Sequence, residues 1–180
     1  TGITEFDEVM QKHFVDSVAA AEYVEMEKIN SLIDVGTGAG FPGIPLKIVY
    51  PHLQVTLLDS LNKRIKFLDE VVDNLGLIGI ETVHGRAEDA AKKAEYREQF
   101  DLSVSRAVAN LASLTEYCLP FVKVGGMFLA LKGPNETVED AMEHVKLLGG
   151  LFYPIELFGF QFELVQQGFA LLALIPIWLY

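Results

Sequence analysis

The chain has 180 residues, of which 51% are hydrophobic and 22% charged, so it is long enough for one domain with a core and is not a disordered polymer. Its formal net charge of -11 argues against a protein that grips nucleic acid by bulk electrostatics, although a local basic patch is compatible with it. The one cysteine, Cys118, excludes an internal disulfide framework, and no Cys/His cluster has the spacing of zinc ligands.

The two ends of the chain bear on its location. The sequence starts without a charged and apolar leader, and a single cysteine fits a reducing compartment, so we expect a cytoplasmic protein. The last apolar run, residues 168–180, is too short for a membrane helix and contains Pro176. We interpret it as a buried final strand and expect no membrane partner.

The first half of the chain predicts a helix, two strands and two further helices. Residues 1–24 have a helical pattern, and a strand over 31–36 runs into a glycine-rich turn. Pro42 suits the first turn of a helix, because the N–H that proline lacks is not needed there. A strand over 53–60 precedes a helix over 61–77, which Gly76 should end. Its apolar face is predicted from the spacing of Leu61, Ile65, Leu68, Val72 and Leu75.

The second half continues the alternation of strands and helices. The expected elements are a strand over 80–85, a polar helix over 88–99, a strand over 100–108, a helix over 110–122, a strand over 125–133 and a helix over 136–148. Two more strands, near 152–160 and 168–175, are expected to pair antiparallel.

This alternation predicts the α/β class, with a mostly parallel seven-stranded sheet, helices on both faces and an antiparallel terminal hairpin. We expect a single domain over residues 1–180. Within it, residues 1–28 form a leading helical segment and residues 29–180 form a Rossmann-like core.

The turn "DVGTGAGFPG" is the most informative stretch. Phe41 stands where the dinucleotide fingerprint requires its third glycine, and the two nearby prolines remove amides that a pyrophosphate would use. The spacing of Gly36, Gly38 and Gly40 instead follows the D-x-G-x-G-x-G pattern of class I S-adenosylmethionine-dependent methyltransferases. Asp59 ends the next strand, where a carboxylate can accept hydrogen bonds from both ribose hydroxyls. The alternative is a tight strand-to-helix turn of any Rossmann-like protein.

Seven motifs extend the resemblance beyond the superfamily. In chain order they are "HFVDS", "DVGTGAGFPGIPLKI", "DSLNKRIKFL", "HGRAED", "SRAVANL", "CLP" and "GGMFLALKG". Over roughly residues 1–150 the chain resembles the RsmG (GidB) family of bacterial 16S ribosomal RNA guanine-N7 methyltransferases. The resemblance implies S-adenosylmethionine as the cofactor and 16S rRNA in the small ribosomal subunit as the partner.

The resemblance also implies roles for individual residues. Gly36 and Phe41 are expected to contact the cofactor from the first turn, and Ala87 and Glu88 of "RAE" to lie beside its adenine. Arg106 of "SRA" is expected to face the cofactor and the reaction centre as a positioning residue. The alternative for Glu88 is a solvated carboxylate favoured by the helix dipole, and for Arg106 a structural salt bridge.

Other polar residues receive weaker interpretations. Arg86 and Lys132 follow strands three and five, where open α/β sheets bind ligands, and are candidate RNA-facing cations or ordinary surface charges. His13 is interpreted as a packing or capping residue of the leading helix, and Cys118 as a core residue. Asn62 is a candidate for fixing its loop, while Lys63 and Arg64 are expected on a solvated helix face.

The expected chemistry is positioning without a general base. The chain lacks the D/N-P-P-Y/F box of adenine-N6 enzymes after strand four and has no cysteine where cytosine-C5 enzymes carry their nucleophile. Guanine N7 is an exposed lone-pair acceptor and needs no deprotonation before it attacks a methyl donor. Holding N7 in line with the methyl–sulfur bond and excluding water would therefore suffice.

Two departures from the family keep other functions open. No Lys or Arg follows Lys146, where the family has a basic tail, and the chain begins inside a family segment, so we expect leading helices to be missing. Phosphate contacts supply much of RNA affinity, so these losses should affect RNA binding before cofactor binding. The alternatives are a cofactor-binding, catalytically impaired domain that acts through protein partners, and a small-molecule methyltransferase. A monomer is favoured.

Overall fold

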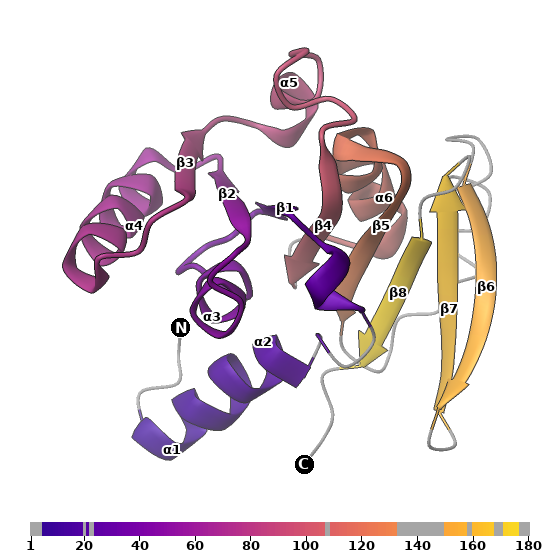
Figure 1. Ribbon diagram of the computed structural model, residues 1–180, viewed down its shortest axis with the longest axis horizontal. Coiled ribbons are helices and arrows are strands. Elements are labelled where there is room, and N and C mark those ends of the chain that lie inside the picture. Colours follow the sequence, from indigo (N-terminus) through magenta and orange to yellow (C-terminus); the bar gives the residue numbers. More distant parts are fainter. Residues whose placement is uncertain are drawn as a thin grey trace.

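The computed structural model describes residues 5–19, 21, 24–106 and 109–132, together with the strands at 150–157, 160–167 and 171–176. Six strands form one parallel sheet in the order β3-β2-β1-β4-β5-β8 (Figure 1). They are β1 (Ser31–Val35), β2 (Gln54–Asp59), β3 (Ile80–His84), β4 (Phe100–Arg106), β5 (Val122–Lys132) and β8 (Leu171–Pro176). The strand order reverses between β1 and β4, and ligands of open α/β sheets bind at the carboxyl end of such a switch point.

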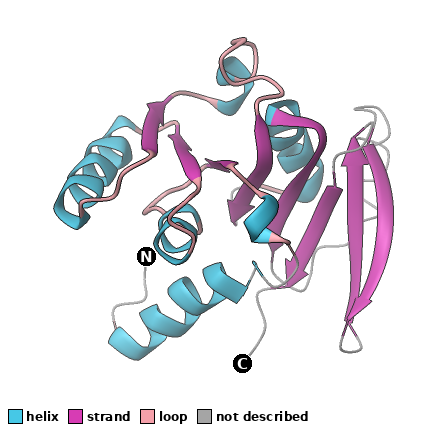
Figure 2. Cartoon of the chain, viewed as in Figure 1, coloured by secondary structure: helices cyan, strands magenta, loops and turns pink. Residues whose placement is uncertain are grey.

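Helices lie on both faces of the sheet (Figure 2). The elements between the strands are α3 (Gly43–Val49), α4 (Asn62–Leu75), α5 (Ala87–Ala90), α6 (Leu111–Cys118) and the 3₁₀ turn η4 (Leu119–Phe121). The side chains of α3 and α4 share one buried cluster, and those of α5 and α6 share the other. Alternation along β1 feeds both clusters, because Leu32 lies in the first and Ile33 in the second.

A leading helical segment precedes the sheet and lies beside α3 in Figure 1. It consists of α1 (Phe6–Val9), the π-helical η1 (Met10–Val15) and α2 (Asp16–Ala19), and the 3₁₀ turn η3 (Met26–Lys28) then leads into β1. No helix in the described ranges is long and apolar enough to cross a membrane.

The predicted strands and most helices of the core are confirmed within one to three residues. Gly76 ends α4 in the left-handed conformation, at φ 62°. Of the predicted apolar face of α4, Ile65 and Leu68 are buried, whereas Leu61 and Leu75 at its two ends are more than half exposed. The helix predicted over 136–148 lies outside the described residues.

Two predictions of secondary structure are wrong. The polar helix expected over 88–99 is only the single turn α5, followed by irregular turns that include Glu98 at φ 56°. Its sequence buries only Ala90 and Ala91 on the core, so no apolar stripe supports a longer helix. The second error concerns the last strands.

The predicted seven-stranded sheet is replaced by the six-stranded parallel sheet and a separate two-stranded ribbon. Strand β6 (Gly150–Leu157) pairs antiparallel with β7 (Phe160–Gln167), and β8 lies parallel beside β5. The prediction had read 152–160 as one strand that pairs with 168–175. Only two positions, the second of them Gly159, separate β6 from β7, which is the spacing of a tight hairpin connection.

Candidate functional site

The glycine turn joins β1 to α3 at the switch point of the sheet. The backbone N–H groups of Gly36 and Thr37 both donate to the carbonyl oxygen of Leu58 in β2, at 2.8 and 3.1 Å. Gly36, Gly38 and Gly40 have φ angles of 72°, 61° and 94°, a region that side chains rarely adopt. A Cβ at Gly40 would also lie 2.5 Å from a side-chain atom of α3. The three glycines are therefore required by the turn itself, whatever the turn binds.

Asp34, the residue before this turn, is a buried carboxylate that the sequence analysis did not include among the site residues. Its Oδ2 accepts hydrogen bonds from Thr37 Oγ1 at 2.7 Å and from the Gly43 N–H at 2.9 Å. Its Oδ1 is buried and has no hydrogen-bond partner. Burial raises the pKa of Asp34 from 3.8 to about 6. The leading Asp of the D-x-G-x-G-x-G pattern was the signal that could have identified it.

Asp59 ends β2 as predicted, and its side chain is almost fully buried. Its Oδ2 accepts from the Gly38 N–H at 3.0 Å, and its Oδ1 accepts from the Leu61 N–H at 2.9 Å. Arg64 donates to Oδ2 from 3.1 Å, so the prediction that this cation is only solvated is wrong, although half of its side chain is exposed. Asp59 thus connects the glycine turn to the start of α4.

A cavity of about 340 Å³ lies at the carboxyl ends of β1, β2 and β3. This volume is within the range of small-ligand sites. The cavity contains predicted cofactor contacts from three separate segments, namely Gly36, Asp59, Ala87 and Glu88. Its remaining lining residues are Val35, Leu58, Ser60, Gly85, Arg86 and Tyr117. Arg86, predicted to face RNA, therefore lies at the edge of this cavity, and Glu88 is in the first turn of α5.

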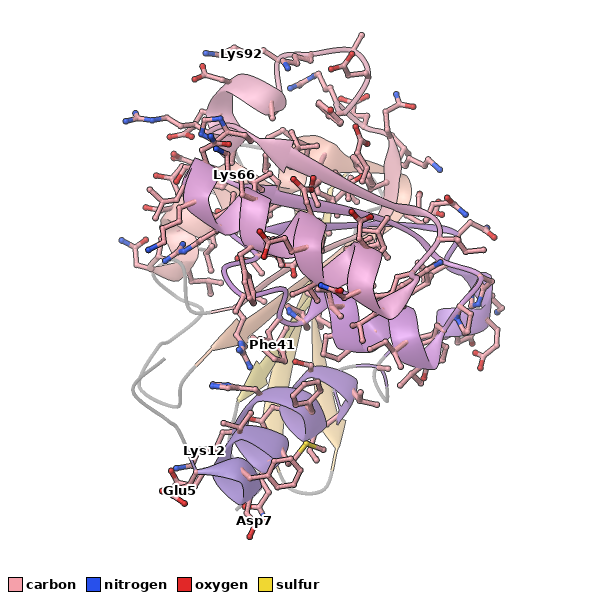
Figure 3. The ribbon with its side chains drawn as sticks, turned by 90° about the vertical axis from the view of Figure 1, so that its left-hand side faces the viewer. Glu5, Asp7, Lys12, Phe41, Lys66 and Lys92 are labelled. Carbon is pink, nitrogen blue, oxygen red and sulfur yellow. The ribbon has the colours of Figure 1, made fainter. Side chains whose placement is uncertain are left out.

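Arg106 and Phe41 are not among these lining residues and form a second cluster with the leading helical segment. The guanidinium carbon of Arg106 lies 5.1 Å from the centre of the Phe41 ring, and its NH1 donates to Lys12 O at 3.2 Å. The rings of His13 and Phe14 lie 5.3 and 5.0 Å from that of Phe41. Burial lowers the pKa of Arg106, and the carboxylates of Asp34 and Asp16 oppose this shift. Figure 3 shows Phe41 between the leading segment, which carries Lys12, and the body of the protein.

Other predicted residues have plainer positions. Lys132 is the last residue of β5, paired in register with Pro176 of β8; its side chain lies outside what the structure describes. Asn62 is the first residue of α4. Cys118 is fully buried, which raises the pKa of its thiol and agrees with a core role. Among the described residues, no group of three or more His, Cys, Asp or Glu side chains could hold a metal ion.

Comparison with known proteins assigns the chain to one family model. The model described as rRNA small subunit methyltransferase G (GidB) matches residues 1–148. The ribosomal RNA small subunit methyltransferase G of Clostridium novyi is 55% identical over 152 residues, which are 83% of this chain and 63% of that protein. The protein of the same name from Acetivibrio thermocellus is 51% identical over 169 residues, 93% of this chain and 69% of that protein. The chain thus spans about two thirds of the length of its relatives.

Solved structures give the fold. A putative S-adenosylmethionine-dependent methyltransferase from Methanococcus maripaludis superposes with a TM-score of 0.67 over 89% of both chains, at 18% identity. An S-adenosylmethionine-dependent O-methyltransferase from Thermotoga maritima superposes with a TM-score of 0.60 over 82% of this chain and 58% of that chain, at 16% identity. The architecture is that of a Rossmann-like S-adenosylmethionine-dependent methyltransferase.

Proposed function

Because the chain belongs to the GidB family of rRNA small subunit methyltransferase G proteins, we propose that it methylates N7 of a guanine in 16S rRNA of the small ribosomal subunit, with S-adenosylmethionine as the methyl donor. The observation that carries the proposal is the juxtaposition of the glycine turn, Asp59 and the "RAE" segment around one cavity at the switch point. The proposal keeps residues 1–180 as one domain with its core at 29–180, acting as a cytoplasmic monomer.

The residues present fit the chemical parts of this cofactor. Asp34 has a buried carboxylate oxygen without a partner close to the turn, which suits the ammonium of the amino-acid end. Asp59 suits the ribose hydroxyls, and Ala87 and Glu88 lie where an adenine would complete the cavity. Gly36, Gly38 and Gly40 let a ligand approach the backbone closely.

When bound, S-adenosylmethionine supplies a methyl group on a sulfonium, and the protein has to orient the base that attacks it. Phe41 offers a ring face, and Arg106 offers a planar set of N–H donors that can hold a carboxylate, a phosphate or a base oxygen. Guanine N7 carries a free lone pair, so no proton has to be removed and none of these residues needs to act as a base. Catalysis then rests on orientation and exclusion of water. Arg86 and Lys132 are proposed to face the RNA.

The proposal is tested with labelled S-adenosylmethionine and small ribosomal subunits that lack the modification. We expect label in the RNA and, in a calorimetric titration, tighter binding of S-adenosylmethionine than of NAD. Cofactor binding without transfer to subunits would instead favour the impaired domain that acts through protein partners. Transfer to small molecules alone would favour the third candidate.

A further inference from the structure

The Phe41 ring is held between the leading helical segment and Arg106. The His13 ring is tilted by 37° against Phe41, and the Phe14 ring meets it edge-on at 89°. On the other side, the Arg106 guanidinium lies over the ring and donates to the carbonyl oxygen of Lys12. The leading segment therefore does more than cover the core, because it forms one wall of the cluster proposed to orient the base.

The same carbonyl oxygen fixes the tautomer of His13. The Nδ1 atom lies 3.0 Å from Lys12 O, and an oxygen of this kind can only accept, so the ring proton is on Nδ1. Burial and the nearby Arg106 charge lower the pKa of His13, with Asp16 opposing them, so the ring is neutral at pH 7. A neutral imidazole with its proton on Nδ1 presents a lone pair on Nε2.

This Nε2 atom is shielded from water and has no hydrogen-bond partner. Leaving a buried acceptor unpaired costs about 1–3 kcal/mol, so such groups need a reason. The interpretation of His13 as a packing or capping residue explains its ring contact and its Nδ1, but it leaves Nε2 unexplained. A histidine that served only to pack on Phe41 could be replaced by an apolar ring.

We propose that His13 is a positioning residue for the target guanine, with Nε2 accepting a hydrogen bond from N1–H or from the 2-amino group of that base. This inference rests on the proposed function. Guanine carries both donors on its Watson–Crick edge, away from N7, whereas adenine has a lone pair at N1 and no 2-amino group. A lone pair at Nε2 therefore favours guanine and repels adenine while N7 stays free to react. Aromatic rings beside the base are typical of enzymes that extrude a nucleotide to modify it.

Three substitutions separate this role from packing. His13→Phe keeps a ring against Phe41 and removes the acceptor, His13→Gln places an amide oxygen near the position of Nε2, and His13→Asn can replace only Nδ1. We expect the Phe and Asn variants to lose at least about tenfold in methyl transfer to small subunits, with S-adenosylmethionine affinity within about twofold of wild type. His13→Gln should keep most of the activity. His52→Phe is the matched control, because His52 precedes β2 at the opposite edge of the sheet.

Base analogues give the decisive reading. Small subunits reconstituted with guanosine, inosine or 1-methylguanosine at the target position are compared with wild-type protein and with His13→Phe. Inosine lacks the 2-amino group and 1-methylguanosine lacks N1–H, so wild type should discriminate against at least one analogue, and His13→Phe should lose that discrimination. A folded His13→Phe with wild-type transfer, or with unchanged discrimination, overturns the inference and leaves the proposed function intact. No transfer by wild type to any subunit overturns both.

Discussion

Asp59→Asn is the sharpest perturbation of the proposed cofactor site. The carboxylate of Asp59 accepts from Gly38 N, Leu61 N and Arg64, and the proposal adds the ribose hydroxyls as ligand partners. An amide keeps one accepting oxygen and loses the charge, and a charge-assisted hydrogen bond is worth about 1.5–3 kcal/mol. We therefore expect the affinity for S-adenosylmethionine to fall about 10- to 100-fold, which is about 1.4–2.8 kcal/mol.

The assay is calorimetric titration of folded Asp59→Asn, with Arg64→Ala as its matched control. Arg64 is half exposed and occupies the same carboxylate oxygens, so its removal should leave the affinity unchanged or raise it slightly. Circular dichroism and thermal melting identify a variant that has lost its fold, since the amide leaves one backbone N–H without its acceptor. A folded Asp59→Asn that binds S-adenosylmethionine like wild type would refute the assignment of Asp59 to the ribose.

Three further outcomes are expected. Arg106→Ala should lower methyl transfer to small subunits by at least about tenfold, or 1.4 kcal/mol, and Arg106→Lys should also be damaging because it keeps the charge but loses the planar set of donors; wild-type rates and cofactor affinity would make Arg106 a structural cation. Gly43→Ala should lower the free energy of unfolding in urea by about 1–3 kcal/mol, since its Cβ would lie 2.6 Å from a Leu57 methyl carbon, whereas Gly85→Ala meets nothing within 4 Å; equal losses would contradict this. Because burial raises the pKa of Asp34 from 3.8 to about 6, the folded state holds the proton more tightly than the unfolded chain, so the free energy of unfolding should fall by about 3 kcal/mol as the pH rises from 4 to 6; Asp34→Asn should remove this part of the urea-unfolding pH profile, and an identical profile would count against it.

The core elements and the Asp59 edge could be predicted because their signals are local. Apolar runs of strand length mark β1, β2 and β4, and Gly76 ends α4 through its own backbone freedom. The carboxyl ends of parallel strands meet at one edge of a sheet, so Asp59 and the "RAE" segment could be expected around one site. The cavity brings them together.

Contacts between distant segments could not be predicted in this way. The hydrogen bond from Arg106 to the Lys12 carbonyl joins residues 94 positions apart, and no periodicity reports which helix will lie over which strand end. The unpaired Nε2 of His13 follows from that packing alone. Arg64 was misjudged because its position in α4 shows a solvated face but not the reach of its side chain back to Asp59. The end of the sheet was misread because the short hairpin connection before β7 was taken as part of a strand.

The central claim is that this chain methylates N7 of guanine in the RNA of the small ribosomal subunit. The most direct measurement incubates wild-type protein with methyl-labelled S-adenosylmethionine and small subunits that lack the modification, then digests the 16S rRNA and identifies the labelled nucleoside by mass spectrometry. The account predicts labelled 7-methylguanosine, reduced at least about tenfold with Arg106→Ala. Label on another atom or base, or no label in the RNA from a protein that binds S-adenosylmethionine, would contradict it.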